Sequence, residues 1–396
     1  MRGPEDYRSV TSDPGGTMAR SDAEILGRAD VDDLESIVSM TNTDVDEIEH
    51  VVADHGDAIF TWDYERSRAA LVKLYEKAKT SQWNGETDLD WSIDVDPERM
   101  ARESFGLPTR AGFAAIGVDL AGTALDRLSD DDWVTFQVER QNWMLSQFLH
   151  GEQGALLCTA KIVETVPWID AKYYAATQVI DEARHVEVFA KYLDTKLEGH
   201  YPINVHLRML LDDIIDDSRW DMTYLGMQIM VEGLALASFG LMQQGTPDPL
   251  LKQLLRYVMS DEARHVAFGV LTLQEYYAGL TSAELRDRQE FAFEAAVRMR
   301  DRFLSQEVWE RMGVPVVDAL RVFRSDDPAK RNEDPFQQLL FSKIVPNCKK
   351  LGLLDANDGW LRARFDTLGV SVFEDWADTG EEYELLDEVA RDRAAV

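Results

Sequence analysis

The chain has 396 residues, 45% of them hydrophobic, and is therefore long enough to bury a sizeable core. Its 73 acidic and 41 basic residues give a net charge of −32, which argues against nucleic acid and anionic membrane surfaces as partners. Two cysteines, Cys158 and Cys348, cannot form a disulfide framework, and residues 1–20 lack the apolar run of an export signal, so we expect an acidic, cytoplasmic protein.

The chain divides into four regions by pattern. Residues 1–30 are polar and rich in Gly and Asp, and we expect a flexible acidic tail there. Residues 31–130 combine short helical patterns with a Trp-rich stretch, which predicts a helical extension whose tryptophans pack on the core. Long helical patterns separated by Gly and Pro breakers fill residues 131–280, and a helical C-terminal extension follows over residues 281–396.

Within residues 131–280 the breakers predict four long helices, at residues 131–165, 168–198, 220–244 and 250–278. A short helix at 205–217 crosses between the second and third, and two more helices are expected at 282–312 and 335–353. No stretch alternates with period two over a useful length, so the sequence predicts an all-α fold.

One segment, residues 222–242, is apolar over roughly the length that a bilayer requires. Glu232 lies at its centre, where a carboxylate is costly in lipid but suits the inward face of a helix in a large core. We therefore predict a buried core helix and no membrane span.

The sequence contains an internal repeat. The hexapeptide DEARHV occurs at residues 181–186 and again at 261–266, an offset of 80, and the same offset maps Glu152 onto Glu232. Each half therefore offers a Glu and, 30 residues later, a Glu-x-x-His motif. Residues at i and i+3 share one helix face, so the Glu and His of each motif reach a common point.

Two such helix pairs, packed together, bring four carboxylates and two imidazoles to one axis, as in di-iron and di-manganese carboxylate bundles. Hard oxygen ligands with one imidazole per metal suit iron or manganese, and the lack of thiolates argues against zinc-finger and iron–sulfur sites. The predicted metal ligands, which would also be the catalytic residues, are Glu152, Glu182, His185, Glu232, Glu262 and His265.

The remaining charged residues of the repeat predict a supporting layer. Asp181 and Asp261 would accept the outer ring N–H of the histidine on the partner helix, and Arg184 and Arg264 would neutralise the aspartates. The alternative is that both DEARH segments are exposed charged turns of helix. The matched upstream glutamates argue against that alternative.

At these residues the sequence resembles the ferritin-like, ribonucleotide-reductase-like superfamily of di-iron carboxylate proteins. The resemblance covers residues 131–278, and the paired motif is similar to those of bacterial multicomponent monooxygenases and the reductase small subunit. It implies a ferritin-like four-helix bundle, a homodimer, and two iron ions that activate dioxygen, with Mn–Fe or Mn–Mn as alternatives. By resemblance, Glu152, Glu182 and His185 would bind one iron and Glu232, Glu262 and His265 the other, with Glu182 and Glu262 bridging.

The chain departs from each better-known subfamily. Phe189 stands where the reductase subunit has its radical tyrosine, and Glu152 where that subunit often has Asp. Leu236 replaces the threonine of the multicomponent monooxygenases, and Val258 replaces the seventh ligand, a histidine, of amine N-oxygenases. No subfamily matches cleanly.

Apolar residues one turn from the ligands would form a wall that excludes water and binds an apolar substrate. Plain core packing explains the same residues equally well. The predicted pocket residues are Phe148, Ala155, Phe189, Leu236, Phe239 and Val258.

Three functions remain open at this point. The favoured one is an oxygenase or oxidase acting on a small, largely apolar organic substrate, because the extensions exceed what a storage bundle needs. The second is metal or oxygen detoxification, as in ferroxidases, peroxidases or manganese catalases. The third is a reductase-like radical subunit or non-catalytic scaffold. The chain has no flavin, nicotinamide or ferredoxin motif, which suggests a separate reductase.

Overall fold

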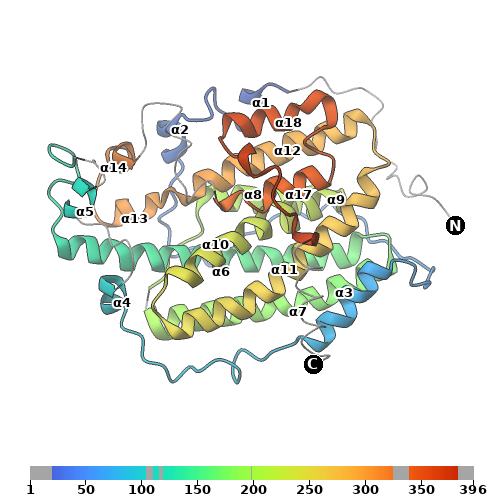
Figure 1. Ribbon diagram of the computed structural model, residues 1–396, viewed down its shortest axis with the longest axis horizontal. Helices are drawn as coiled ribbons and strands as arrows, with labels where there is room; N and C mark the ends of the chain where they lie inside the picture. Colours follow the sequence, from blue (N-terminus) through green and yellow to red (C-terminus); the bar gives the residue numbers. More distant parts are fainter. Residues whose placement is uncertain (1–19, 104–109, 116–118, 198, 324–338, 382–396) are drawn as a thin grey trace.

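The structure, a computed structural model, describes residues 20–103, 110–115, 119–197, 199–323 and 339–381 (Figure 1). Across these residues the fold is all-α, with helices and no β-strand, which confirms the predicted fold class. Three long helices begin close to their expected positions, at α6 (Asp130–Thr165), α7 (Ile169–Tyr192) and α11 (Pro249–Tyr277). The short crossing helix is α8 (Val205–Asp216).

Local chemistry explains these boundaries. α6 begins with a capping box, in which the side chains of Ser129 and Asp132 each accept a backbone N–H of the other residue. α11 begins with Asp248 as its N-cap and Pro249 in the first turn, where the missing proline N–H costs nothing. α7 continues into a short π-helix, η2 (Leu193–Leu197).

The third predicted helix contains a π-helical segment. It consists of α9 (Trp220–Tyr224), the π-helix η3 (Leu225–Val231) and α10 (Glu232–Gly245). The backbone N–H of Glu232 donates to the carbonyl of Met227, five residues earlier, so the π-type winding ends at a predicted metal ligand. Short π segments inside α-helices are frequent at functional sites.

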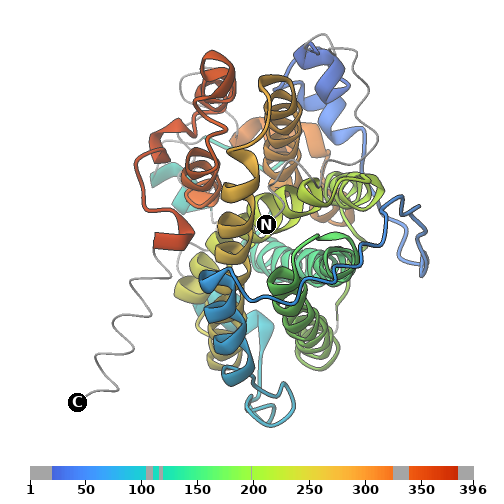
Figure 2. The same cartoon turned by 90° about the vertical axis from the view of Figure 1, so that its right-hand side faces the viewer.

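Four helical segments that carry the repeat pack against one another. α6 lies along α7, α10 along α11, α11 contacts α7, and η3 contacts α6. α6 and α7 follow the long axis of the molecule (Figure 1) and are seen nearly end-on in Figure 2. α3 (Ala69–Thr80) packs on both α7 and α11, and α12 (Ser282–Asp301) packs on η3 and on α18 (Ala356–Thr367).

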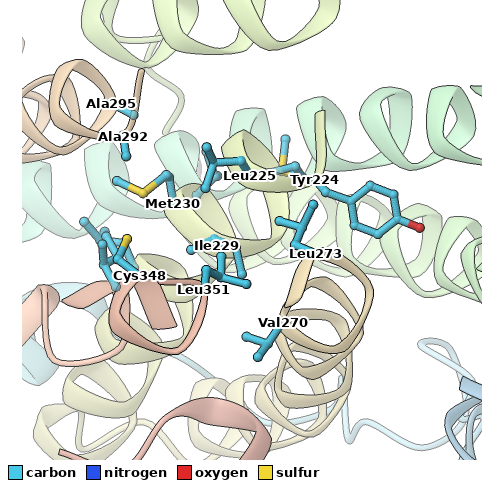
Figure 3. Packing of buried hydrophobic residues seen from close by; sticks show 14 of the residues in the cluster. Tyr224, Leu225, Ile229, Met230, Val270, Leu273, Ala292, Ala295, Cys348 and Leu351 are labelled. Atoms are coloured by element: carbon cyan, nitrogen blue, oxygen red, sulfur yellow. The ribbon is translucent and has the colours of Figure 1, made fainter. Parts of the chain in front are cut away.

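The apolar η3 segment is buried because three neighbouring elements surround it. Its residues meet side chains of α11, α12 and α17 (Ile344–Lys350) in one hydrophobic cluster (Figure 3). Residues labelled there include Leu225, Ile229, Met230, Val270, Leu273, Ala292, Ala295 and Cys348.

Among the described residues, only the segment Trp220–Gly245 is long and apolar enough to cross a membrane. In its most apolar stretch, 72% is buried inside the protein, as is common for a core helix.

The N-terminal expectations need correction. Residues 20–30 are not a tail: α1 (Asp22–Leu26) carries a capping box and packs on α12. Arg20 pairs with Glu290 at 2.8 Å, and Arg28 pairs with Asp301 at 2.6 Å, which ties this segment to the core. Residues 1–19 lie outside the described part of the chain.

The two extensions are less helical than expected. Residues 47–68 form no helix, and the N-terminal helices besides α1 are α2 (Leu34–Val38), α3, α4 (Pro97–Glu103) and α5 (Arg110–Ala115).

The helix expected at 282–312 breaks after α12. A 3₁₀ turn, η4 (Arg302–Leu304), leads to Ser305 in the left-handed region (φ 53°) and then to α13 (Gln306–Arg311). Within the second expected helix, at 335–353, residues 335–338 lie outside the described part, and α17 covers only its middle. The elements that follow α13 are α14 (Val316–Phe323), α17, α18 and η5 (Ser371–Phe373).

Candidate metal centre

The six predicted ligands, here called the Glu/His cluster, meet in the interior. Each is at most 5% exposed, and they come from α6, α7, α10 and α11. They form two groups, within each of which the candidate ligand atoms lie within 4.8 Å of one another. The first group is Glu152, Glu182, His185 and Glu262, and the second is Glu182, Glu232 and His265. Either group could hold a metal ion.

Two glutamates lie between the two histidines. Glu182 places Oε1 3.0 Å from Nδ1 of His265 and Oε2 3.3 Å from Nδ1 of His185. Glu262 places Oε1 3.1 Å from Nδ1 of His185 and Oε2 3.6 Å from Nδ1 of His265. Each carboxylate therefore directs one oxygen toward each histidine, which is the arrangement that a bridging ligand requires.

Several buried atoms of the Glu/His cluster make no hydrogen bond. They are Oε2 of Glu182, Oε2 of Glu232, both carboxylate oxygens of Glu262, and Nδ1 of His265. Buried polar atoms are normally satisfied, so a set of unpaired oxygens and nitrogen facing one another fits a cation. The four glutamates and the two aspartates of the repeat, set against its two arginines, leave four negative charges, the charge of two divalent ions.

Burial and mutual repulsion set the protonation of the metal-free cluster. Burial raises the pKa of Glu152 to about 8 and that of Glu232 well above its usual range. Burial alone would lower the pKa of His185 and His265, but the charges and hydrogen bonds of the neighbouring carboxylates raise both well above the usual value. At neutral pH these four groups hold protons that a metal must displace.

Each histidine donates its other ring N–H across to the opposite helix. Nε2 of His185 lies 3.2 Å from Oδ2 of Asp261, and Nε2 of His265 lies 3.3 Å from Oδ2 of Asp181. These are the contacts expected from the repeat. They hold Nδ1 of each ring toward the glutamates.

The two arginines of the repeat close this network. Arg184 donates from Nη2 to Asp181 at 2.5 Å and to Asp261 at 3.0 Å. Arg264 donates from Nη2 to Asp261 at 2.5 Å and to Asp181 at 3.2 Å. Each aspartate thus contacts both guanidiniums, so the two aspartates balance the two arginines, and all four side chains are buried. The alternative of exposed charged helix turns is wrong.

Two supporting residues come from outside the repeat. Nε1 of Trp83 donates to Oδ2 of Asp261 at 2.8 Å, and Nε2 of Gln82 donates to Oδ1 of Asp181 at 3.0 Å. The guanidinium of Arg184 lies 4.7 Å from the centre of the Trp83 ring. Packing was the expected role of the tryptophans, and no sequence pattern links these residues to the aspartates.

Gln178 is a third supporting residue that the sequence analysis missed. Its Nε2 donates to Oε1 of Glu182 and to Oε1 of Glu232, at 2.9 Å each. An offset of 80 places Val258 at the equivalent position, so the repeat is broken here. A comparison of the two halves could have identified Gln178 as a polar residue one turn before a ligand.

A small cavity of roughly 20 Å³ adjoins the cluster, enough for about one water-sized molecule. Phe148, Ala155 and Phe239 line it as expected, whereas Phe189, Leu236 and Val258 are not among its lining residues. Phe189 instead stacks behind Phe239, with ring centres 5.8 Å apart. The other lining residues are Gln147, Gly151, Glu152, Val231, Glu232, Ala235, Glu262 and Arg302.

A scan against models of known protein families finds no match for this chain, and a search of curated proteins finds no matching protein. The structure of the described residues establishes an all-α chain with a buried Glu/His cluster that could hold metal.

Proposed function

We propose that the Glu/His cluster binds two iron ions and that the chain is a dioxygen-activating di-iron oxygenase or oxidase. The observation that carries this proposal is the position of Glu182 and Glu262, each of which faces both histidines. The resemblance of the doubled motif to the ferritin-like, ribonucleotide-reductase-like superfamily supports a four-helix bundle of that type. Manganese in one or both positions remains compatible with the same ligands.

The metal pair would supply the reduction of dioxygen, with electrons from a separate reductase. The chain itself provides the surroundings. Asp181 and Asp261 orient the two histidines, Gln178 fixes Glu182 and Glu232, and the buried rings of Phe148 and Phe239 keep bulk water from the cavity. A small organic molecule would be oxidised at the cavity side of the pair.

The size of the cavity favours a second candidate. About 20 Å³ accommodates dioxygen or peroxide, whereas a larger substrate requires side chains to move. A ferroxidase, peroxidase or manganese-catalase-like detoxification function uses only such small molecules.

Metal stoichiometry tests the ligand assignment. Metal-free protein loaded anaerobically with Fe(II) should retain two ions per chain. Glu182→Gln should lose both ions because this residue belongs to both ligand groups, and Glu232→Gln should retain about one. Glu187→Gln, an exposed change on the same helix as Glu182, is the control and should retain both. Equal retention by all three variants would contradict the assignment.

Oxygen consumption then separates the two candidates. Iron-loaded protein with a chemical reductant should consume dioxygen beyond the amount needed to oxidise its Fe(II), and more quickly when an organic substrate is present. Consumption only in proportion to added Fe(II), whatever organic compound is offered, would favour detoxification.

We also propose a homodimer. Residues 47–68 form no helix and expose large apolar side chains, with Val51 at 90%, Phe60 at 78% and Trp62 at 76%. Exposed apolar groups gathered on one segment mark protein–protein contacts. A second copy of the chain would cover them.

A further inference from the structure

Arg302 is a buried cation without an anion. Its side chain belongs to η4, and the residue is 3% exposed. Its Nε makes no hydrogen bond, its Nη1 lies 3.6 Å from the sulfur of Met299, and its guanidinium lies 4.8 Å from the centre of the Phe303 ring. No carboxylate among the described residues forms an ion pair with it. Burial alone lowers its pKa to about 9.

The other buried cations of the described chain are all paired. Arg184 and Arg264 share the two aspartates of the repeat, as described above. Arg288 forms two hydrogen bonds to Asp221, at 2.9 and 3.0 Å, and Lys161 pairs with Asp54 at 2.8 Å. A buried charge without a partner is strongly disfavoured, so the exception at Arg302 points to a missing anion.

Arg302 lines the small cavity beside the Glu/His cluster. Glu152, Glu232 and Glu262 line the same cavity, so Arg302 and the open side of the ligand set border one space. Two divalent metal ions would neutralise the cluster with its aspartates and arginines, which leaves the charge of Arg302 uncompensated.

The fold brings Arg302 there from outside the four helices of the repeat. α12 ends at Asp301, and Arg302 is the first residue of the 3₁₀ turn η4. The buried Ser305 follows this turn in the left-handed conformation.

We infer that Arg302 binds the carboxylate of a small organic acid beside the proposed metal pair, and that such an acid is the substrate class of this site. The planar guanidinium fork matches a carboxylate in two parallel hydrogen bonds. The apolar walls, Phe148 and Phe239, favour a short-chain monocarboxylate, and the cavity of roughly 20 Å³ must widen by side-chain movement to admit it. The location beside metals rests on the proposed function, whereas the anion site itself depends only on Arg302.

Acetate and acetamide form a matched pair of probes because they have the same shape and differ in charge. Thermal unfolding and calorimetric titration would be run on full-length protein, metal-free and Mn(II)-loaded, in chloride buffers of equal ionic strength. We expect acetate, but not acetamide, to raise the unfolding temperature of the wild type. Arg302→Met should weaken acetate binding by about 10- to 100-fold, and Arg302→Lys should give an intermediate loss.

The unfolding temperatures of the variants show whether a loss of acetate binding results from misfolding. Arg302→Met removes an unpaired buried charge and should unfold at the wild-type temperature or above. Arg288→Met leaves the buried carboxylate of Asp221 without its partner and should unfold at a lower temperature. Arg288→Met should still bind acetate, because its guanidinium is not in the cavity wall.

Three results would overturn the inference. These are equal effects of acetate and acetamide, no acetate effect beyond that of chloride, and unchanged acetate binding in Arg302→Met. In the Mn(II)-loaded protein, the third result would place the anion on the metals. Metal content measured on the same samples separates this inference from the proposed function. Acetate binding that needs Arg302 in protein that takes up no metal would leave the anion site standing while the di-iron proposal fails.

Discussion

Replacing Asp261 with Asn should destabilise the metal-free protein strongly. The carboxylate accepts hydrogen bonds from Arg184, Arg264, His185 and Trp83. Asparagine keeps the size of the side chain but removes its charge. Two buried guanidiniums would then share a single aspartate, Asp181.

The expected cost follows from the burial of these groups. Breaking a buried ion pair by removing one partner costs about 3–5 kcal/mol, because the other charge stays buried. Asp181→Asn should cost a similar amount, since Asp181 accepts from the same two arginines and from His265. Trp83→Phe removes one neutral donor from the same carboxylate and should cost about 1 kcal/mol.

Urea unfolding of the metal-free variants measures these differences, and Mn(II) titration measures the effect on the site. Because each aspartate holds the outer ring nitrogen of one histidine, both asparagine variants should lose about 10- to 100-fold in metal affinity. If Asp261→Asn cost less free energy of unfolding than Trp83→Phe, the charge network would not stabilise the fold as argued.

Two further predictions concern protons and assembly. Metal loading at pH 7 should release about four protons per chain, measured by calorimetry in buffers of different ionisation enthalpy, because Glu152, Glu232 and the two histidines must give up theirs. Metal affinity should therefore rise with pH. The number of protons released should fall by about one as the pH rises through about 8, where Glu152 ionises in the metal-free protein. Release of almost no protons at pH 7 would contradict the protonation of these four groups. Phe60→Ser with Trp62→Ser should convert a dimer to a monomer in analytical ultracentrifugation, and a monomeric wild type would refute the dimer.

The long helices were predictable because Gly and Pro breakers separate them and because capping residues mark the starts of two of them. Ser129 and Asp132 start α6, and Asp248 with Pro249 starts α11. The break at Ser305 was not predictable in the same way. The residues around it contain no Gly or Pro, so the left-handed turn is imposed by packing rather than by a local stop signal.

The residues of the candidate site also fall into a predictable group and an unpredictable group. The six members of the Glu/His cluster and the four charged residues around them were predictable because they form an internal repeat with an offset of 80 residues. Trp83, Gln82 and Arg302 occur once and lie far from the repeat in sequence. Only the fold brings them to it, so no spacing rule could have found them.

Departures from the repeat make the two halves of the site differ in hydrogen bonding and in access to the cavity. Glu182 and Glu262 are equivalent in sequence, yet Glu182 accepts a hydrogen bond from Gln178, whereas neither oxygen of Glu262 accepts one. Glu262 also lines the cavity, and Glu182 does not. The position equivalent to Gln178 is the apolar Val258, which leaves Glu262 without a fixing donor. The two equivalent glutamates therefore differ: Glu182 is fixed by a hydrogen bond, whereas Glu262 is not and borders the cavity that Arg302 also lines. A small molecule that reaches the proposed metal pair would therefore meet Glu262 before Glu182.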